Sequence, residues 1–286
     1  LFGAIGDPKY DNDPSAKIRP EQGLLKMRKK LGLFANIRPT FTFSSLIDKS
    51  PLKKERINGT DLVFVRELTS GIYFGDRGRK DDGNTAYDTC TYKREEIIRL
   101  AKKGFELSMK RTKKLCCVDK ANVLESSRLW RETVQSMEKD YPEVQVSYEF
   151  VDAVAMRLIQ WPNSYDVLIT ENLFGDILTD EASVISGSMG LMPSASIGNY
   201  NSLFEPIHGS FPQATGKNIA NPLAAILSAA MMFEMAFSLK EEAECIKKSV
   251  EKSLEKGIIT EDLTQNNEKA YKTNDVGDFI KNEILL

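Results

Sequence analysis

A regular alternation of apolar runs with amphipathic stretches constrains the fold of this chain more than any other feature. Residues 60–66, 115–118 and 165–170 are apolar runs of the length of strands. Residues 95–110 carry apolar side chains at helical spacing, and residues 126–139 are predicted to form a second helix. Alternating strands and helices predict an α/β protein with a mostly parallel sheet, and ligands bind such sheets where the strands end.

Less regular segments complete the predicted architecture. Residues 1–6 are interpreted as the end of a buried strand that enters a glycine turn, and residues 34–38 as a strand that ends before Pro39. Residues 144–151 form a further predicted strand, and two helices are expected after Pro222. The first of these helices is the most apolar stretch of the chain. It is too short to span a bilayer, so a position in the core or at a subunit interface is expected.

Composition places the chain among ordinary globular proteins. Apolar residues make up 41% and charged residues 28% of its 286 residues, which is typical of a protein with a sizeable buried core. The net charge of -2 provides no basic surplus for binding nucleic acid or an anionic membrane. Four cysteines and one histidine show no zinc-binding spacing, so reduced, structural cysteines and a cytoplasmic location are expected.

Two acids in the helix predicted after residue 170 have the spacing of a cation site. Asp176 and Asp180 lie four residues apart, so both carboxylates project from one face of the helix. Paired carboxylates suit a hard divalent cation such as Mg²⁺ or Mn²⁺, which retains water and accepts substrate oxygens. The pair alone could also be acids that the dipole of the helix favours near its N-terminus.

Arginine, lysine and tyrosine side chains near strand and helix ends are further candidates for chemistry. Arg28, Arg38 and Arg66 could hold a substrate with two carboxylates if they converge, because guanidinium groups bind carboxylates with paired hydrogen bonds. Lys120 beside a bound cation could act as a base, and Tyr73 could relay a proton. Taken singly, each arginine could also be a member of a surface ion pair. The lysine could be an ordinary surface residue, and the tyrosine an ordinary core residue.

The sequence signal for nucleotide binding is weaker. The chain has neither the G-x-G-x-x-G fingerprint of Rossmann domains nor a Walker motif. Residues 205–210 and 216–222 form a polar loop with glycines before a helix, and its backbone donors could bind a nucleotide. The same loop could also be a plain connection between a strand and a helix.

Four longer motifs follow one another along the chain. They are FANIRP at 34–39, VRELTSGIYFG at 65–75, VDKANVL at 118–124 and NLFGDILTD at 172–180. In this order the motifs resemble those of the isocitrate and isopropylmalate dehydrogenase family, although the opening βαβ unit of that family has no counterpart here. The resemblance implies two domains. Residues 1–33 and 187–286 would form a discontinuous cofactor-side domain without its N-terminal segment, and residues 34–186 the substrate, metal and dimerisation domain.

The resemblance implies that the chain oxidises and decarboxylates a malate-type 2-hydroxy acid with NAD and a divalent metal. Arg28, Arg38 and Arg66 would bind the malate carboxylates. Lys120, contributed by the partner subunit, would be the general base for oxidation of the alcohol. Tyr73 would then protonate the enol that decarboxylation leaves.

The resemblance also implies an active site that is shared between the two subunits of a homodimer. Asp176 and Asp180 would bind Mg²⁺ or Mn²⁺, and Asp152 would complete the metal site from the other subunit. The nicotinamide would lie near Glu21 and Asn122. The adenine half of the cofactor would contact the loop before the apolar helix, through His208, Gly209, Ser210, Gln213 and Asn221.

The choice of cofactor and substrate follows from particular side chains. NAD-using members usually carry an acidic residue in place of Gln213, but no cation nearer than Lys217 is available for the 2′-phosphate of NADP, so NAD is expected. The resemblance implies that Leu24, Leu25 and Val123 form the wall that faces the third substituent of the substrate, and an apolar wall favours an isopropyl group over the carboxymethyl group of isocitrate. The expected substrate is therefore 3-isopropylmalate, an intermediate of leucine biosynthesis.

Three alternatives remain open at this point. The chain could be a tartrate or homoisocitrate dehydrogenase of the same family. It could also be a catalytically silent homologue, although such a protein would be expected to have lost acids, the lysine or the tyrosine, all of which are present. The third alternative is a stable but inactive truncated fragment of a true enzyme.

Overall fold

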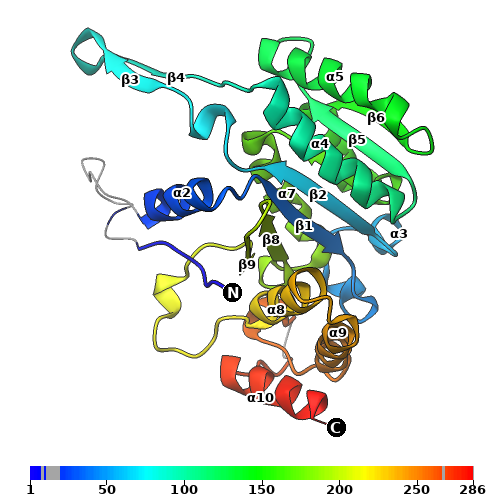
Figure 1. Ribbon diagram of the computed structural model, residues 1–286. Helices are drawn as coiled ribbons and strands as arrows, with labels where there is room; N and C mark the ends of the chain where they lie inside the picture. Colours follow the sequence, from blue (N-terminus) through cyan, green and yellow to red (C-terminus); the bar gives the residue numbers. More distant parts are fainter. Residues whose placement is uncertain (8–9, 11–19, 266–267, 286) are drawn as a thin grey trace.

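The computed structural model describes residues 1–7, 10, 20–265 and 268–285, and within them a seven-stranded sheet forms the centre of the molecule (Figure 1). The strand order is β6-β5-β7-β2-β1-β8-β9. The first four of these strands run parallel, whereas β1 is antiparallel to both of its neighbours and β9 is antiparallel to β8. Strand β8 therefore points the same way as the parallel strands, and the predicted α/β class with a mostly parallel sheet is confirmed. The strands of this sheet are β1 (Ala35–Phe41), β2 (Asp61–Glu67), β5 (Lys114–Asp119), β6 (Gln145–Phe150), β7 (Val167–Thr170), β8 (Pro193–Ile197) and β9 (Ser202–Pro206).

Helices cover both faces of the sheet because the side chains of a buried strand alternate between its two faces. Cys117 belongs to the core that α4 and α5 cover, whereas its neighbour Cys116 belongs to the core that α6 and α7 cover. All four cysteines are free thiols, as predicted. A third apolar core lies among α8, α9 and α10. The helices are α2 (Pro20–Leu31), α3 (Lys54–Ile57), α4 (Arg94–Met109), α5 (Glu125–Met137), α6 (Val151–Gln160), α7 (Asn172–Ser186), α8 (Leu223–Ala236), α9 (Lys240–Glu255) and α10 (Thr273–Ile284).

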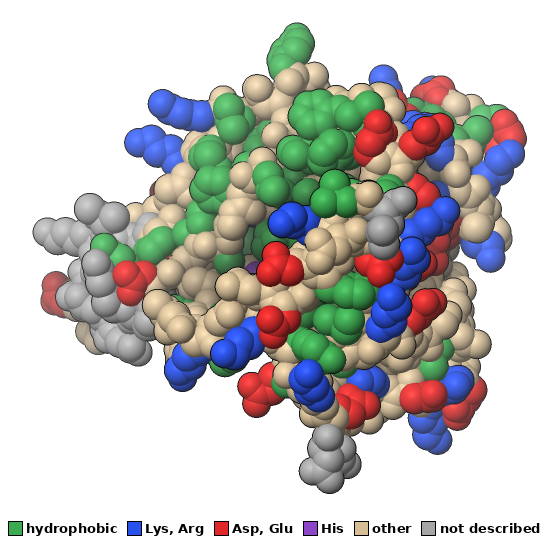
Figure 2. Space-filling view, turned by 90° about the horizontal axis from the view of Figure 1, so that it is seen from below, with side chains coloured by type: hydrophobic (Ala, Val, Ile, Leu, Met, Phe, Trp, Pro, Cys, Tyr) green, Lys and Arg blue, Asp and Glu red, His purple; other side chains and the backbone are tan. Residues whose placement is uncertain are grey.

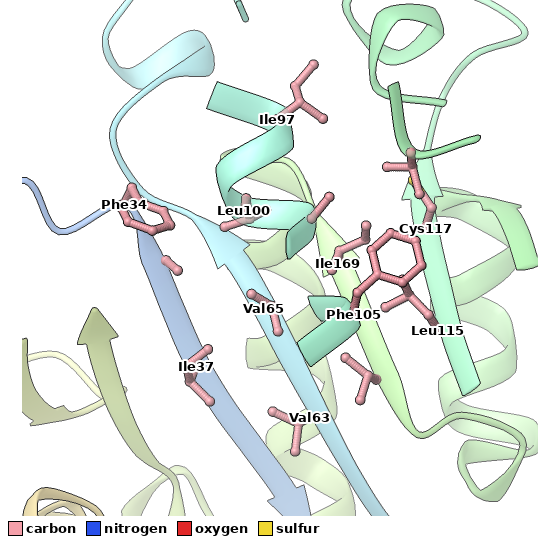
Figure 3. Packing of buried hydrophobic residues seen from close by; sticks show 14 of the residues in the cluster. Phe34, Ile37, Val63, Val65, Ile97, Leu100, Phe105, Leu115, Cys117 and Ile169 are labelled. Carbon is pink, nitrogen blue, oxygen red and sulfur yellow. The ribbon is translucent and has the colours of Figure 1, made fainter. Parts of the chain in front are cut away.

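Helix α4 illustrates how the predicted periodicity becomes packing. Its residues Ile97, Leu100 and Phe105 recur at helical spacing and are fully buried. They belong to one buried cluster with Val65 of β2 and Ile169 of β7, and Phe105 lies between these strands and Leu115 of β5 in the view of Figure 3. This contact holds β2 and β7 in place, and both strands end at the candidate site described below.

Strand β1 does not end before Pro39 as predicted, but continues to Phe41. Pro39 lies opposite Val63, whose N–H donates away from β1 to the carbonyl of Asp166. The proline nitrogen therefore faces the other edge of β1, where the described pairing with β8 stops at Ile37. A sheet tolerates proline at such a position because no ladder hydrogen bond is lost.

The prediction of a strand over residues 1–6 is wrong. Leu1 and Phe2 are exposed, and residues 1–7 have no regular secondary structure. Within the described residues, the N–H of Phe2 donates to the carbonyl of Phe204 at 2.8 Å, but no ladder follows from this bond. Apolar composition alone did not identify a strand here, because a strand also needs a neighbour along its length.

Other elements were absent from the sequence-based prediction. Among the residues described after Pro222 there are three α-helices, not two, since α10 comes after α9. Helix α6 begins directly after β6 without a loop to mark the boundary. An exposed hairpin, β3 (Arg77–Lys80) with β4 (Thr85–Asp88), projects from the body of the molecule (Figure 1).

The sheet contains strands from both predicted domains, since β8 and β9 continue the ladder that starts from β1. The division into two domains stays a prediction. In the part of the chain that the structure describes, no helix is long and apolar enough to cross a membrane. On the face shown in Figure 2, basic and acidic side chains are interspersed and do not form a single basic surface.

Candidate active site

The candidate active site lies where β1 and β2 meet helix α7. Arg38 on β1 and Arg66 on β2 are both buried. Asp176 and Asp180 are one turn apart on α7, as their spacing predicted. The Nη1 of Arg66 donates to Asp176, and the guanidinium of Arg38 lies 3.9 Å from Asp176 and 4.0 Å from Asp180. Two predicted carboxylate binders and two predicted metal ligands therefore form one cluster.

Partners that the sequence did not single out hold the two arginines in this cluster. Arg66 donates from Nε to the carbonyl of Asn172 at 2.9 Å and from Nη2 to the side-chain oxygen of the same residue at 2.8 Å. Arg38 donates to the hydroxyl of Thr179 and to the side chain of Asn36. Asn172 and Thr179 belong to the motif that supplies the acids, and Asn36 belongs to the motif around Arg38. In the sequence, only their positions within these motifs pointed to a role in holding the arginines.

Gly175 allows helix α7 to approach the sheet closely enough for these contacts. A Cβ at this position would lie 2.3 Å from Oγ1 of Thr170 and 2.6 Å from Cγ of Arg66. Neither neighbour can move far, because Thr170 and Arg66 are both buried. The glycine in this motif therefore serves the packing of the site.

Tyr73 completes the cluster from the 3₁₀ turn after β2. Its hydroxyl donates to Oδ2 of Asp176 at 2.8 Å, and the guanidinium of Arg66 lies over its ring at 5.9 Å from the centroid. Burial and then the negative charge of Asp176 raise the pKa of Tyr73 to about 12. The phenol is therefore protonated at neutral pH and can act as a proton donor.

Burial away from water shifts the pKa values of charged groups in the cluster. Burial, followed by the charge of Arg66, lowers the pKa of Arg38 to about 9, which leaves the guanidinium charged at neutral pH. Burial also raises the pKa of Asp180. The side chains of Asp176 and Asp180 keep 37% and 56% of their surface exposed, so their oxygens are accessible to a cation. A bound cation would favour the ionised form of both acids.

Lys120 and Asp152 form an ion pair with each other, outside this cluster. Lys120 follows β5 directly, and Asp152 lies in the first turn of α6. In the described part of the chain, no three acidic, histidine or cysteine side chains come together as a metal site. Asp152 therefore does not join Asp176 and Asp180 within one chain.

Helix α2 carries Arg28 and two residues of the predicted apolar wall, Leu24 and Leu25. Arg28 donates from Nη2 to the buried Glu205 at 2.7 Å, and its buried Nε has no hydrogen-bond partner among the described residues. Leu24 and Leu25 are half-buried on the same helix. Val123 follows β5 and is 61% exposed. The structure brings Arg28 to the end of β9 through Glu205, a partner that the sequence did not predict.

A hollow of about 370 Å³ lies beside the loop predicted to bind the cofactor, and its lining includes Gly6, Ser210 and Phe211. A Cβ on Gly6 would come within 2.6 Å of Oγ of Ser210 and 3.7 Å of the Glu21 carboxylate. Two predicted cofactor-binding residues, Glu21 and Ser210, therefore flank this glycine. A side chain on the glycine would fill the space between them.

The other predicted cofactor-binding residues lie on loops. Nδ1 of His208 is 3.0 Å from the carbonyl of Gly209, and Gln213 is exposed in a short 3₁₀ turn. The Asn221 side chain accepts the N–H of Leu223 at the start of α8 and donates to Asp262. Asn122 is exposed in the turn after Lys120. The structure does not bring Asn122 to the hollow beside Ser210.

Comparison with known proteins identifies the family. Residues 1–280 match the family model described as isocitrate/isopropylmalate dehydrogenase. The chain belongs to this family. Among its relatives, the protein named 3-isopropylmalate dehydrogenase from Bacteroides fragilis is 58% identical over 280 residues, which cover 98% of this chain and 78% of the relative. The protein of the same name from Clostridium acetobutylicum is 50% identical over 288 residues, with coverage of 99% and 80%.

A solved structure supports the same family assignment at the level of the fold. The crystal structure of isocitrate dehydrogenase from Methylococcus capsulatus superposes with a TM-score of 0.89 at 31% sequence identity. The match covers 99% of this chain and 80% of that chain. The resemblance inferred from the four motifs is therefore confirmed for the family and for the fold.

Proposed function

We propose that this chain carries out the NAD-dependent oxidative decarboxylation of 3-isopropylmalate to 2-oxoisocaproate, in leucine biosynthesis and in the cytoplasm. The observation that carries the proposal is the cluster of Arg38, Arg66, Tyr73, Asp176 and Asp180. These residues supply cations for carboxylates, paired acids for a metal and a protonated phenol. The names of the relatives from Bacteroides fragilis and Clostridium acetobutylicum support this substrate over others in the family.

The residues of this chain bind and orient the substrate in the proposed reaction. Arg38 and Arg66 hold malate carboxylates, and the buried Nε of Arg28, which has no partner among the described residues, can donate to a third oxygen. Asp176 and Asp180 would hold Mg²⁺ or Mn²⁺. When bound, the divalent cation would stabilise the negative charge on the ketone oxygen during loss of CO₂, and NAD would accept the hydride.

Two side chains move protons in the proposed reaction. The amine of Lys120 accepts the proton of the substrate hydroxyl as the alcohol becomes a ketone. The hydroxyl of Tyr73 gives its proton to the carbon of the enol that decarboxylation leaves, and must first release its hydrogen bond to Asp176. The raised pKa of Tyr73 fits this role, because the phenol holds its proton until the carbanion-like carbon is present.

The proposed active unit is a homodimer in which each site takes residues from both subunits. Within one chain, Tyr73 contacts Asp176 of α7, whereas Lys120 pairs with Asp152 outside that cluster. Two ligands from one chain leave a divalent cation with an incomplete set of protein oxygens, and Asp152 of the second subunit would add a third. The same arrangement would bring Lys120 to the substrate.

Substrate and cofactor choice form the finer part of the proposal. The half-buried Leu24 and Leu25 and the exposed Val123 are apolar surfaces suited to an isopropyl group once the dimer forms. Tartrate and homoisocitrate would leave polar groups against them without partners. Along the sequence, the cation nearest to Gln213 is the exposed Lys217, four residues on, so the loop offers a hydrogen bond to ribose hydroxyls and supports NAD over NADP.

A steady-state comparison tests the proposed function. The protein containing this chain is assayed with Mn²⁺ and 3-isopropylmalate, isocitrate, tartrate and homoisocitrate, each with NAD and with NADP. The proposal expects kcat/KM for 3-isopropylmalate with NAD to exceed every other combination by at least about a hundredfold. Equal values for 3-isopropylmalate and isocitrate would contradict the apolar wall. A higher value with NADP would contradict the cofactor assignment, and no turnover with any acid would favour a silent homologue.

A further inference from the structure

Arg131 on helix α5 holds the turn that carries Lys120. Its Nε and Nη2 donate to the carboxylate of Asp119 at 2.8 and 3.0 Å, a paired contact that fixes direction as well as distance. Asp119 is the last residue of β5, is fully buried and also accepts the N–H of Ala121 at 2.9 Å. Lys120 lies between Asp119 and Ala121 in the sequence, so its backbone is held on both sides.

Arg131 also reaches the adjacent strand β6. Its guanidinium lies 5.5 Å from the ring centroid of Tyr148 and 5.2 Å from that of Phe150. Phe150 is the last residue of β6 and directly precedes the helix whose first turn carries Asp152. The Nζ of Lys120 lies 5.8 Å from the same Phe150 ring and pairs with Asp152. One guanidinium therefore contacts both corners from which the Lys120–Asp152 pair projects.

We propose that Arg131 is a positioning residue for the half of the active site that Lys120 and Asp152 contribute. The proposal rests on the proposed function, in which Lys120 accepts the proton of the substrate hydroxyl. A lysine side chain is a flexible stem, and the Asp152 side chain is 65% exposed, so neither fixes the other. The buried carboxylate of Asp119 is the rigid point, and Arg131 is its charge partner. A misplacement of about 1 Å at a reacting group can slow a reaction about a hundredfold.

The test measures single-turnover reduction of NAD by 3-isopropylmalate with Mn²⁺, in the protein that contains this chain. Arg131→Met keeps an apolar contact with the rings but loses the paired donors, whereas Arg131→Lys keeps the charge at a single point. We expect Arg131→Met to lower the rate constant of cofactor reduction about 10- to 100-fold, and Arg131→Lys to give an intermediate value. The reaction amplitude and the substrate Kd should not change, because the arginines of the other half-site remain.

A merely structural role for Arg131 predicts a different result. Loss of folded molecules lowers the amplitude but leaves the rate constant of the remaining molecules unchanged, and that outcome would overturn the proposal. The matched control is Arg157→Met, which breaks an exposed ion pair with Glu149 of 2.8 Å between α6 and β6. A rate constant for Arg131→Met within about threefold of this control would also overturn the proposal, since loss of such a supporting contact should cost about tenfold or more.

Two further variants keep the test decisive. If Arg131→Met does not fold, Asp119→Asn combined with Arg131→Met removes the buried charge that lost its partner, and its rate constant is judged by the same criterion. Lys120→Ala separates this proposal from the proposed function. If Lys120→Ala still reduces NAD at the normal rate, the role of Lys120 in the proposed function fails. If Lys120→Ala is inactive and Arg131→Met is normal, only the positioning role fails.

Discussion

Glu171, the residue directly before α7, should make the stability of the protein depend on pH. Its side chain accepts a hydrogen bond from Ser127, and the residue is only 3% exposed. Burial, with a smaller contribution from the charge of Asp119, raises its pKa from the ordinary 4.5 to about 7. The folded state therefore holds a proton that the unfolded state releases between these two pH values.

The sign and size of the effect follow from this difference in pKa. Because the folded state binds the proton more tightly, the free energy of unfolding falls as the pH rises from 4.5 to 7 and the loss is complete above 7. At about 1.4 kcal/mol for each pH unit, ionising Glu171 costs the folded state roughly 3 kcal/mol. Glu171→Gln carries no charge at any of these pH values and should escape the loss.

The assay is urea unfolding of the protein and of Glu171→Gln at pH 5, 6, 7 and 8. The stability of the variant relative to the unmodified protein should rise with pH by roughly 2–3 kcal/mol and become constant above pH 7. The other titrating groups cancel in this difference. The control is Glu132→Gln on α5, which makes the same substitution at an exposed position. A flat difference for Glu171→Gln, or one that falls with pH, would refute the reasoning.

Three other variants test the site and the core. Asp176→Asn should lower the affinity of the substrate complex for Mn²⁺ at least about tenfold and abolish turnover, with little change in Tm; unchanged Mn²⁺ affinity in calorimetry would exclude a cation site on α7. Tyr73→Phe should lower kcat about 10²- to 10⁴-fold with a smaller change in KM, because it removes the proton donor; a kcat close to that of the unmodified protein would exclude this role. Phe105→Ala should lower the free energy of unfolding by about 3–5 kcal/mol in urea, since the ring is fully buried; a loss near zero would contradict the packing of α4.

The sequence predicted three of the parallel strands best, because β2, β5 and β7 contain continuous, buried apolar runs. The prediction failed where tertiary pairing decides the structure. Proline normally interrupts a strand, but Pro39 faces an edge of β1 where the described pairing with β8 has stopped. Residues 1–6 are apolar without forming a ladder. Helix α6 directly follows β6, so no turn residue marked its start.

The candidate site was predictable as a set of residues but not as a network. Spacing on one helix placed Asp176 and Asp180 together, and the structure confirms that arrangement. The ion pair of Arg28 with Glu205 joins residues 177 positions apart in the sequence, which no local pattern encodes. The convergence of Arg38 and Arg66 on α7 likewise depends on how strands from separate motifs align. The roles of these residues in catalysis stay predictions.

The shared active site is the central claim of this account, and subunit complementation tests it most directly. Lys120→Ala and Asp176→Asn proteins, each inactive alone, are mixed so that heterodimers form, and the heterodimers are counted by native mass spectrometry. Each heterodimer would contain one site with both lesions and one site with neither, by the two-fold symmetry of the dimer. The account predicts that roughly half of the activity of an unmodified dimer returns for each heterodimer. Heterodimers without activity above that of either variant alone would place Lys120 and Asp176 in the same subunit's site and contradict the claim.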